Sequence, residues 1–423
     1  MAVSLTTEQL TYEQRVARGL CRVCGAEAVE ELFSLGDVPL VNAFLTEREK
    51  RDEVSFPLAL GLCPACSLVQ LRHTVAPERL YQHYLHLSSA ANGQVAHLQS
   101  VARLVAQQLH MTPDTRLLEV GSNDGTLLAN FSGRAGLVLG VDPARNLVAL
   151  SRARGVETVP VFLSETVAGR LRLRYGQFDI IVGLNVVAHT ENVLDLVRAI
   201  KLLLAPGGSF FMEAAYVLKT VVAGQFDTVY HEHVYCFSLH ALQRLLARAD
   251  LAVCAAEVIP TQGTSLRVIA RHREEAPPVE SGVGAILENE REHGLADLET
   301  LRAVGANVER FKQEFATSVA AARRRGPLVG LGAPARGVVI LNACGIGAEW
   351  LEYVVDDTPL KQGRLVPGMH MPVYSWERLA AETPAGYVLL SWNYRDDMLA
   401  RLRRLGKKGP VLIPFPRQEE VQL

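Results

Sequence analysis

The stretch Leu117-Leu118-Glu119-Val120-Gly121-Ser122-Asn123-Asp124-Gly125-Thr126 decides the fold of this chain. Its apolar start predicts a buried strand, and the glycines that follow predict a turn that opens a helix. Such a turn lets a ligand approach the backbone, and the helix start offers free N–H groups. The turn reads G-x-N-x-G, with an acid two residues before the first glycine, whereas a dinucleotide-binding turn reads G-x-G-x-x-G.

A second predicted strand, 137–141, ends at Asp142, seventeen positions beyond Gly125. A carboxylate at this place can accept hydrogen bonds from both hydroxyls of a ribose. The pairing resembles the S-adenosylmethionine (SAM) site of class I methyltransferases, because an acidic turn suits a ligand with an amino group, a sulfonium and no pyrophosphate. An ordinary tight βα turn is the alternative. The resemblance assigns cofactor contacts to Glu119, Gly121, Asn123, Gly125 and Asp142.

Strand and helix patterns alternate from Arg116 to about Ile269, which predicts a parallel sheet with helices on both faces. The expected strands are 116–120, 138–141, 178–184 and 209–213. Asn185 and His189 follow the third of these at its carboxyl end, where open sheets bind ligands. We therefore expect both residues to border the methionine part of SAM.

The chain has 423 residues, 49% of them apolar, which is enough for two or three domains. Its net charge of −2, with both signs interspersed, argues against nucleic acid or an anionic membrane as a partner. The first residues lack the features of a secretory signal, and no apolar run approaches the length of a membrane helix. We expect a soluble cytoplasmic protein that is a monomer or weak dimer.

Four of the seven cysteines form two C-x2-C pairs, Cys21 with Cys24 and Cys63 with Cys66. Four thiolates can close a tetrahedron around zinc, which a reducing compartment favours over disulfides. Thirty-eight residues separate the two pairs, more than the usual spacing, so a redox or accidental pattern stays an alternative. A closed thiolate shell leaves no position for water, so the predicted zinc is structural.

The segment Tyr230-His231-Glu232-His233-Val234-Tyr235 concentrates two imidazoles, a carboxylate and two phenols. On a strand the carboxylate would face away from both imidazoles, but in a loop these groups can converge. A carboxylate beside an imidazole raises its basicity and fixes its tautomer. The H-E-x-x-H pattern is absent and no third ligand for a His-Glu-His metal pair is evident. An acid–base assembly is the preferred interpretation, with a metal pair as the alternative.

The chain resembles the sugar C-methyltransferases that act on nucleotide-linked 4-keto-6-deoxyhexoses in antibiotic pathways. The resemblance rests on the order of the two C-x2-C pairs, the E-x-G-x-N-x-G turn and the motif Tyr230-x-Glu232-His233-x-x-x-Phe237-Ser238. The resemblance covers nearly the whole chain and continues through Gly330-x-Gly332-Ala333, Asp356-Asp357 and Ser391-Trp392-Asn393. It implies an α/β protein with a zinc-binding lobe (1–75), a class I methyltransferase domain (76–275) and a second Rossmann-like domain (276–423). The last is expected to contain a helical connector from about 284 to 325 and to help hold the nucleotide.

The family's chemistry is methylation of a carbon beside the ketone, expected to be C3 of a dTDP-linked sugar, through an enolate. The resemblance makes His233 the base, Glu232 its orienter or the alternative base, and Tyr230 a donor to the enolate oxygen. Expected substrate contacts come from Tyr84, His86, Arg336, Lys361 and Trp392.

Two of these positions depart from the family pattern, which usually has lysine at Arg336 and tyrosine at His86. Methylation at C5 of the same sugar class, O- or C-methylation of another small natural product, and a non-enzymatic zinc-binding module are the alternatives.

Overall fold

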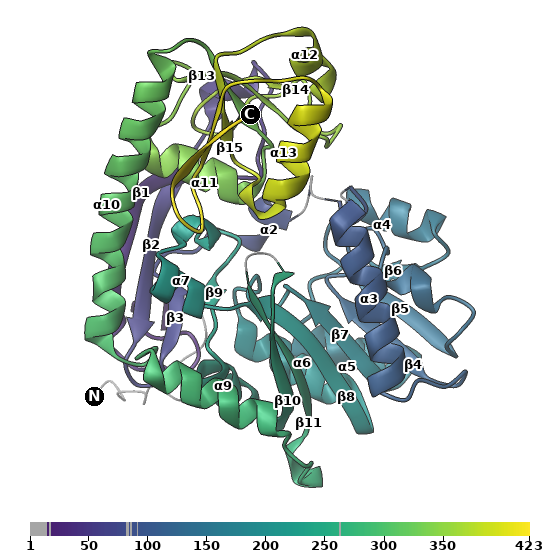
Figure 1. Ribbon diagram of the computed structural model, residues 1–423. Helices are drawn as coiled ribbons and strands as arrows, with labels where there is room; N and C mark the ends of the chain where they lie inside the picture. Colours follow the sequence, from purple (N-terminus) through teal and green to yellow (C-terminus); the bar gives the residue numbers. More distant parts are fainter. Residues whose placement is uncertain (1–14, 17, 82–83, 85–86, 91, 262–263) are drawn as a thin grey trace. The chain divides into compact units, whose positions relative to one another are not determined.

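The computed structural model describes residues 15–16, 18–81, 84, 87–90, 92–261 and 264–423, which form two compact units (Figure 1). Unit 1 comprises the described residues of Met1–Glu30, Gly61–Leu218 and Val234–Leu298. Unit 2 comprises Glu31–Leu60, Lys219–His233 and Glu299–Leu423. The short segment 219–233, which carries most of the predicted acid–base residues, therefore belongs to the unit formed mainly by the C-terminal part of the chain. The predicted domain limits at 75 and 275 stay a prediction.

Unit 1 contains a seven-stranded sheet in the order β10-β11-β8-β7-β4-β5-β6. β11 runs antiparallel to its neighbours β8 and β10, and the other paired strands are parallel. The four expected strands are parallel as predicted, but β11, which begins within the range expected to be parallel, is antiparallel to both of its neighbours. The strands are β4 (Arg116–Val120), β5 (Leu137–Val141), β6 (Glu157–Val159), β7 (Phe178–Leu184), β8 (Leu204–Ala215), β10 (Leu251–Ile259) and β11 (Ser265–His272).

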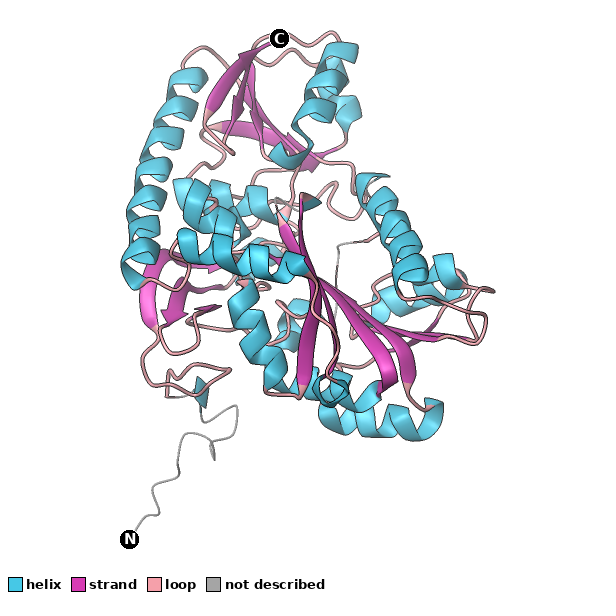
Figure 2. Cartoon of the chain, turned by 60° about the horizontal axis from the view of Figure 1, so that its bottom comes forward, coloured by secondary structure: helices cyan, strands magenta, loops and turns pink. Residues whose placement is uncertain are grey.

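Helices cover both faces of this sheet (Figure 2). In the amphipathic helix α6, Val193, Val197 and Ile200 recur at helical spacing and are buried, and the Asn192 side chain caps the helix by accepting from the Asp195 N–H. The helical segments are α2 (Pro77–Tyr81), α3 (Asn92–Gln108), η3 (Leu128–Phe131), α4 (Arg145–Ala153), α5 (Glu165–Tyr175), α6 (Val193–Leu203), α8 (Leu239–Ala247), η6 (Arg273–Glu275) and α9 (Ser281–Glu292).

Unit 2 contains a six-stranded sheet in the order β14-β13-β12-β15-β16-β17. Its first five strands are parallel and β17 is antiparallel to β16, so the strand order reverses between β12 and β15. This is the second Rossmann-like domain that the resemblance implied. Its elements are α10 (Leu298–Arg323), β12 (Leu328–Leu331), α11 (Ala335–Cys344), β13 (Leu351–Val355), β14 (Val373–Tyr374), α12 (Trp376–Ala381), β15 (Gly386–Leu389), η7 (Trp392–Tyr394), α13 (Arg395–Arg404), β16 (Pro410–Ile413) and β17 (Glu419–Gln422).

Earlier parts of the chain complete unit 2. They are β1 (Glu30–Pro39), η2 (Glu49–Asp52), the first residues of β2 (Ser55–Cys63), most of α7 (Leu218–Ala223) and η4 (Phe226–Thr228). The long helix α10 passes close to β1, because a Cβ at Gly305 would lie 2.7 Å from the Leu32 carbonyl oxygen. A side chain at that position would collide with the strand.

The predicted connector from 284 to 325 is not one helix. α9 ends at Glu292, Gly294 adopts the left-handed φ of 62°, and α10 begins at Leu298. Leu295 lies in this turn and is buried, so an apolar residue here reflects burial and not a place on a continuous helix. Among the described helices, none has the length and apolar character needed to cross a membrane.

Candidate functional site

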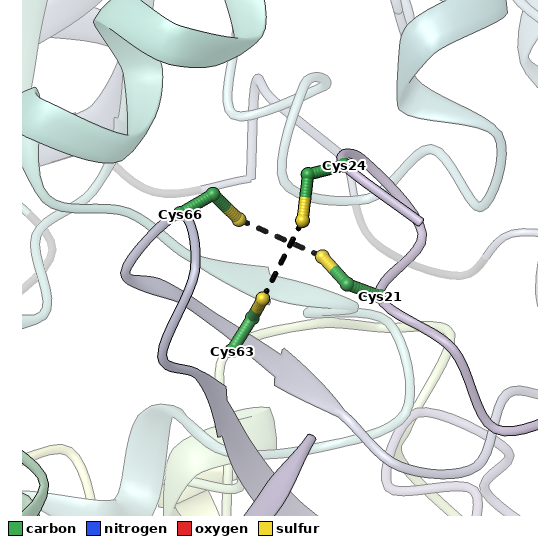
Figure 3. Close-up of side chains that lie close together, drawn as sticks. All are labelled: Cys21, Cys24, Cys63 and Cys66. Carbon is green, nitrogen blue, oxygen red and sulfur yellow. Dashed lines mark hydrogen bonds between the residues drawn. The ribbon is translucent and has the colours of Figure 1, made fainter. Parts of the chain in front are cut away.

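The four predicted metal ligands come together in unit 1, and their sulfur atoms point to a common centre (Figure 3). The sulfurs of Cys21 and Cys66 lie 3.6 Å apart, those of Cys24 and Cys63 lie 3.5 Å apart, and all four lie within 4.8 Å of one another. A zinc ion with bonds of about 2.3 Å separates its tetrahedral sulfur ligands by roughly 3.8 Å. The donor set and its spacing fit zinc, with all four positions taken by protein.

Local backbone structure prepares both halves of this centre. After each C-x2-C pair the chain turns through a left-handed residue, Gly25 with a φ of 77° and Ser67 with a φ of 57°. The Gly25 N–H donates to the Cys21 carbonyl, and the Ser67 N–H donates to the Cys63 carbonyl. Hydrogen bonds from the three other thiols hold the pKa of Cys21 far below its ordinary value. A thiolate is therefore favoured at this position, as metal binding requires.

The predicted cofactor turn follows β4, as expected. Gly121, Asn123 and Gly125 have φ values of 73°, 49° and 76°, so the turn needs residues that tolerate the left-handed region. The Asp142 carboxylate accepts from the Asn123 N–H at 2.8 Å and from the Ala144 N–H at 2.8 Å. The acid that follows β5 is thereby fixed beside the turn.

Charge at this turn suits a cationic ligand. Glu119 is 4% exposed, and its Oε2 has no hydrogen-bond partner among the described residues. Burial, together with the negative charges of Asp142 and Asp124, raises the pKa of Glu119 well above its usual range. Arg154 pairs with Asp124 at 3.3 Å. A ligand with a positively charged amino group and a sulfonium would relieve the repulsion among the carboxylates, so the turn fits SAM.

Asn185 and His189 lie where the sequence placed them, beyond the carboxyl end of β7. Asn185 has a left-handed φ of 59°, and its N–H donates to the Glu213 carbonyl at 2.8 Å. The next residue, Val186, packs against Gly121, so the β7 end adjoins the glycine turn. The His189 ring stacks on Tyr81 at 6.2 Å.

Tyr84 belongs to a segment that is hydrogen-bonded to the cofactor region. Its N–H donates to the Asn146 side chain at 3.2 Å, and its carbonyl accepts from that side chain at 2.8 Å. Farther along, the Ser88 N–H donates to Asn123 at 2.9 Å and the Ser89 N–H donates to an Asp124 oxygen at 3.2 Å. The predicted substrate residue His86 lies outside the described residues.

In unit 2, Tyr230 and His233 form a hydrogen-bonded pair in a loop, with 2.7 Å between the phenol oxygen and Nε2. His233 Nδ1 lies 2.7 Å from the Thr228 carbonyl oxygen. Because a carbonyl only accepts, Nδ1 carries the proton and Nε2 of the neutral ring accepts from the phenol. The loop therefore fixes one tautomer and directs the basic nitrogen at Tyr230.

Burial keeps this imidazole neutral. It lowers the pKa of His233 to about 4; the Thr228 carbonyl opposes the shift, and the positive charge of Arg336 adds to it. A neutral imidazole at physiological pH can accept a proton. The Thr228 carbonyl orients the ring through Nδ1, and the orienting role expected of Glu232 stays a prediction.

The Glu232 carboxylate lies in a second polar cluster of unit 2. Its Oε1 accepts from the Asn42 amide at 2.5 Å. The buried ammonium of Lys361 donates to the Ala333 carbonyl at 2.8 Å. Burial lowers the pKa of Lys361, and the charges of Asp356 and Glu232 partly restore it. Lys361 is therefore a buried cation with two acids nearby.

Arg336 and Trp392 also come together, around a residue that the sequence analysis gave no role. Asp227, fully buried, accepts from Arg336 Nε at 3.0 Å, from Arg336 Nη2 at 2.9 Å and from Trp392 Nε1 at 2.7 Å. The guanidinium lies 4.5 Å from the centre of the Trp392 ring. The expected phosphate contact of Arg336 and base stacking of Trp392 stay predictions.

Sequence reasoning missed Asn42, Thr228 and Asp227. Thr228 contributes only its backbone carbonyl, which any residue type has. Asn42 lies 190 positions from Glu232 and Asp227 lies 109 positions from Arg336, so these contacts leave no short sequence motif. Only the aspartate offered a signal, since it lies three residues before the aromatic and imidazole cluster that begins at Tyr230.

Three family models match the chain in succession. Residues 21–81 match a zinc binding domain, residues 81–256 match a methyltransferase domain, and residues 260–416 match a C-methyltransferase C-terminal domain. The chain is also 33% identical over 399 residues to the C-methyltransferase NovU of Streptomyces niveus, a match that covers 94% of this chain and 95% of that protein.

Two solved structures illustrate the more distant likeness. Magnesium protoporphyrin IX methyltransferase (ChlM) from Synechocystis PCC 6803, with bound SAM, is 16% identical, with a TM-score of 0.32, over 43% of this chain and 82% of that one. The YcgJ protein of Bacillus subtilis is 16% identical, with a TM-score of 0.34, over 42% of this chain and 99% of that one. The family relationship rests on the sequence matches and not on these two structures.

Proposed function

Because the chain belongs to the C-methyltransferase family, we propose that it methylates a carbon beside the ketone of a nucleotide-linked 4-keto-6-deoxysugar, with SAM as donor. C3 of a dTDP-linked sugar is the expected position, within a deoxysugar pathway of antibiotic biosynthesis. The observation that carries the proposal is the Tyr230–His233 pair, a buried neutral base hydrogen-bonded to a phenol. Carbon methylation needs such a base, whereas a zinc-binding module does not.

Unit 1 supplies the cofactor residues in this proposal. Asp142 would accept hydrogen bonds from the ribose hydroxyls, and Glu119 would face the cationic part of SAM. Asn185 and His189 would border its methionine part. Bound SAM supplies an electrophilic methyl group. The zinc centre fixes the fold of the cysteine segments and takes no part in the reaction, since no ligand position is open.

Unit 2 supplies the proton-transfer residues. The Tyr230 hydroxyl donates to His233 Nε2 in the structure. When this hydroxyl turns to donate to the ketone oxygen of the substrate, the Nε2 lone pair becomes available for the proton on the neighbouring carbon. One phenol proton would thus stabilise the enolate oxygen and expose the base in the same movement. Glu232, held by Asn42, is the alternative base.

For the nucleotide, the proposal keeps Lys361 of unit 2 and Tyr84 of unit 1 as substrate residues. Lys361 is the stronger candidate because, among the described residues, its ammonium donates to one acceptor, the Ala333 carbonyl, and so retains protons for an anion. Arg336 already directs two of its nitrogens at Asp227, which makes a phosphate contact less favourable.

The direct test is incubation with SAM and a panel of nucleotide 4-keto-6-deoxysugars. We expect a mass gain of one methyl group, with carbon NMR placing it on a carbon next to the ketone. A methyl group found on oxygen would refute C-methylation.

The base is tested in the same system without methyl transfer, by following hydrogen exchange of the substrate in deuterated water. His233→Asn should abolish the exchange while SAM binding persists, and the exposed His293→Asn is the matched control. Exchange at the wild-type rate in His233→Asn would remove His233 from the base role.

A further inference from the structure

The carboxyl ends of β12 and β15 form the point in unit 2 where the strand order reverses. Helix α11 begins just beyond β12, after Pro334 as its N-cap, and Trp392 follows the end of β15. In open sheets of this kind, the crevice outside these strand ends is where a ligand binds, often with an anionic group. The group that lies in this crevice therefore indicates what the C-terminal Rossmann-like domain does.

In this protein, the carboxylate of Asp227 lies between residues from the two sides of the reversal point. Arg336, the second residue of α11, donates to both of its oxygens, and Trp392 donates to Oδ2 from the β15 side. Arg336 in turn donates from Nη1 to Asn393 at 3.2 Å and stacks on the indole. Asp227 is fully buried, and Arg336 is 9% exposed. A protein carboxylate thus holds the place that an anionic ligand commonly takes.

The residues on either side of Asp227 explain what this contact does. Phe226 packs edge-on against Phe311 at 5.3 Å and against Phe415 at 5.9 Å. Thr228 presents the carbonyl that accepts from His233 Nδ1 at 2.7 Å. The three-residue helix η4 is therefore anchored by one aromatic side chain and one carboxylate, and the peptide that follows sets the imidazole.

We propose that the Asp227–Arg336–Trp392 cluster positions the proton-transfer pair: it anchors η4 on the Rossmann-like lobe and, through the Thr228 carbonyl, fixes the tautomer of His233. Arg336 acts on the reaction through Asp227, without touching the sugar nucleotide. The part of this inference that concerns turnover depends on the proposed function, whereas the part that concerns the imidazole does not.

Two variants separate this role from substrate binding. Asp227→Asn keeps the shape of the side chain but loses the charge that pairs with the guanidinium, and Trp392→Phe keeps the ring but loses the N–H donor. Each should lower kcat, by about 10- to 100-fold for Asp227→Asn and less for Trp392→Phe, and leave KM for the sugar nucleotide within about twofold.

A double variant avoids leaving a buried charge without its partner. Arg336→Ala combined with Asp227→Ala should lower kcat no more than Asp227→Ala alone, because both residues act through one contact. Arg325, which pairs with Glu420 on the surface of the same lobe, provides the control: Arg325→Ala should leave kcat and KM unchanged. The proposal would be overturned if Arg336→Ala raised KM for the sugar nucleotide and if its effect added to that of Asp227→Ala in the double variant. Such a result would show direct contact between Arg336 and the nucleotide.

The imidazole itself is measured without any substrate. With ¹⁵N-labelled histidine, the His233 nitrogen shifts should report Nδ1 protonated in the wild type and a mixture of tautomers in Asp227→Asn and in the double variant. SAM affinity equal to the wild type is the folding control. If these folded variants keep the wild-type tautomer, the cluster does not position His233, whether or not the protein methylates sugars.

Discussion

The buried imidazole of His233 should make the stability of the protein depend on pH in a predictable direction. Its pKa is lowered to about 4 in the folded protein, chiefly by burial, from an ordinary value of 6.5. Between these values the unfolded chain binds a proton that the folded protein does not, so stability falls as pH falls from about 6.5 to about 4. About 2.5 pH units separate the two values, which corresponds to roughly 3.5 kcal/mol at about 1.4 kcal/mol per unit, and about 3 kcal/mol of this is lost by pH 4, where the folded group is half protonated.

Urea unfolding of the wild type and of His233→Gln isolates this contribution, because both proteins share every other titrating group. The free energy of unfolding of the wild type, relative to that of the variant, should fall by about 3 kcal/mol between pH 7 and pH 4. Titration of the His233 ring by NMR provides the direct check. A ring that titrates near pH 6.5, or a wild type and variant with parallel pH profiles, would refute the buried neutral base.

Three further outcomes are expected. Cys63→Ser should release about one zinc per chain, measured by metal analysis, and lower the unfolding temperature, whereas the buried Cys236→Ser should keep the metal. Asp142→Ala should weaken SAM binding in calorimetry by about 1.5–3 kcal/mol, and an unchanged dissociation constant would place the ribose elsewhere. Gly332→Ala should cost about 3 kcal/mol of unfolding free energy, because its φ is +82° and the new Cβ would lie 2.7 Å from the Cβ of Ser391, which rotation of the hydroxyl does not relieve. Gly406→Ala, at a φ of +65° with open space, should cost ~1 kcal/mol.

The features predicted correctly from the sequence are those set by short-range patterns. β4 and β7 have the predicted bounds because runs of apolar residues buried on both sides give parallel strands. The two cysteine pairs come together because each pair is itself a turn, and four thiolates share one chemistry. Likewise the glycine spacing around Gly121 and Gly125 encodes a left-handed backbone that few other residues adopt.

The roles of individual groups depend on contacts between distant segments, which no local pattern encodes. Glu232 next to His233 in sequence suggested a carboxylate–imidazole pair, which stays a prediction. The hydrogen bonds of Glu232 with Asn42 and of His233 with the Thr228 carbonyl were not visible in the sequence. In the same way, Arg336 near a glycine turn suggested phosphate binding. Phosphate binding stays a prediction, whereas the ion pair with Asp227, 109 positions earlier, was not visible in the sequence.

The two Rossmann-like sheets repeat one arrangement with opposite electrostatics. In unit 1, Asp142 after β5 accepts from the N–H of Asn123 in the preceding glycine turn, and in unit 2, Asp356 after β13 accepts from the N–H of Ala333 at 2.7 Å. Burial would raise the pKa of Asp356, but the charge of Lys361 and hydrogen bonds lower it below its usual range, whereas the pKa of Asp142 is raised, chiefly by burial.

In the acidic turn of unit 1, Arg154 pairs with Asp124, but Glu119 and Asp142 have no ion-pair partner among the described residues, so a cationic ligand can supply the missing charge. The turn of unit 2 is instead neutralised by the protein's own lysine. Asp227 likewise fills the anion position at the reversal point of the second sheet. The second Rossmann-like sheet thus holds the loop that carries the proposed base His233. The contacts of Asp227 with Arg336 and Trp392 explain why residues 219–233 belong to unit 2, although the methyltransferase domain model, at 81–256, includes them.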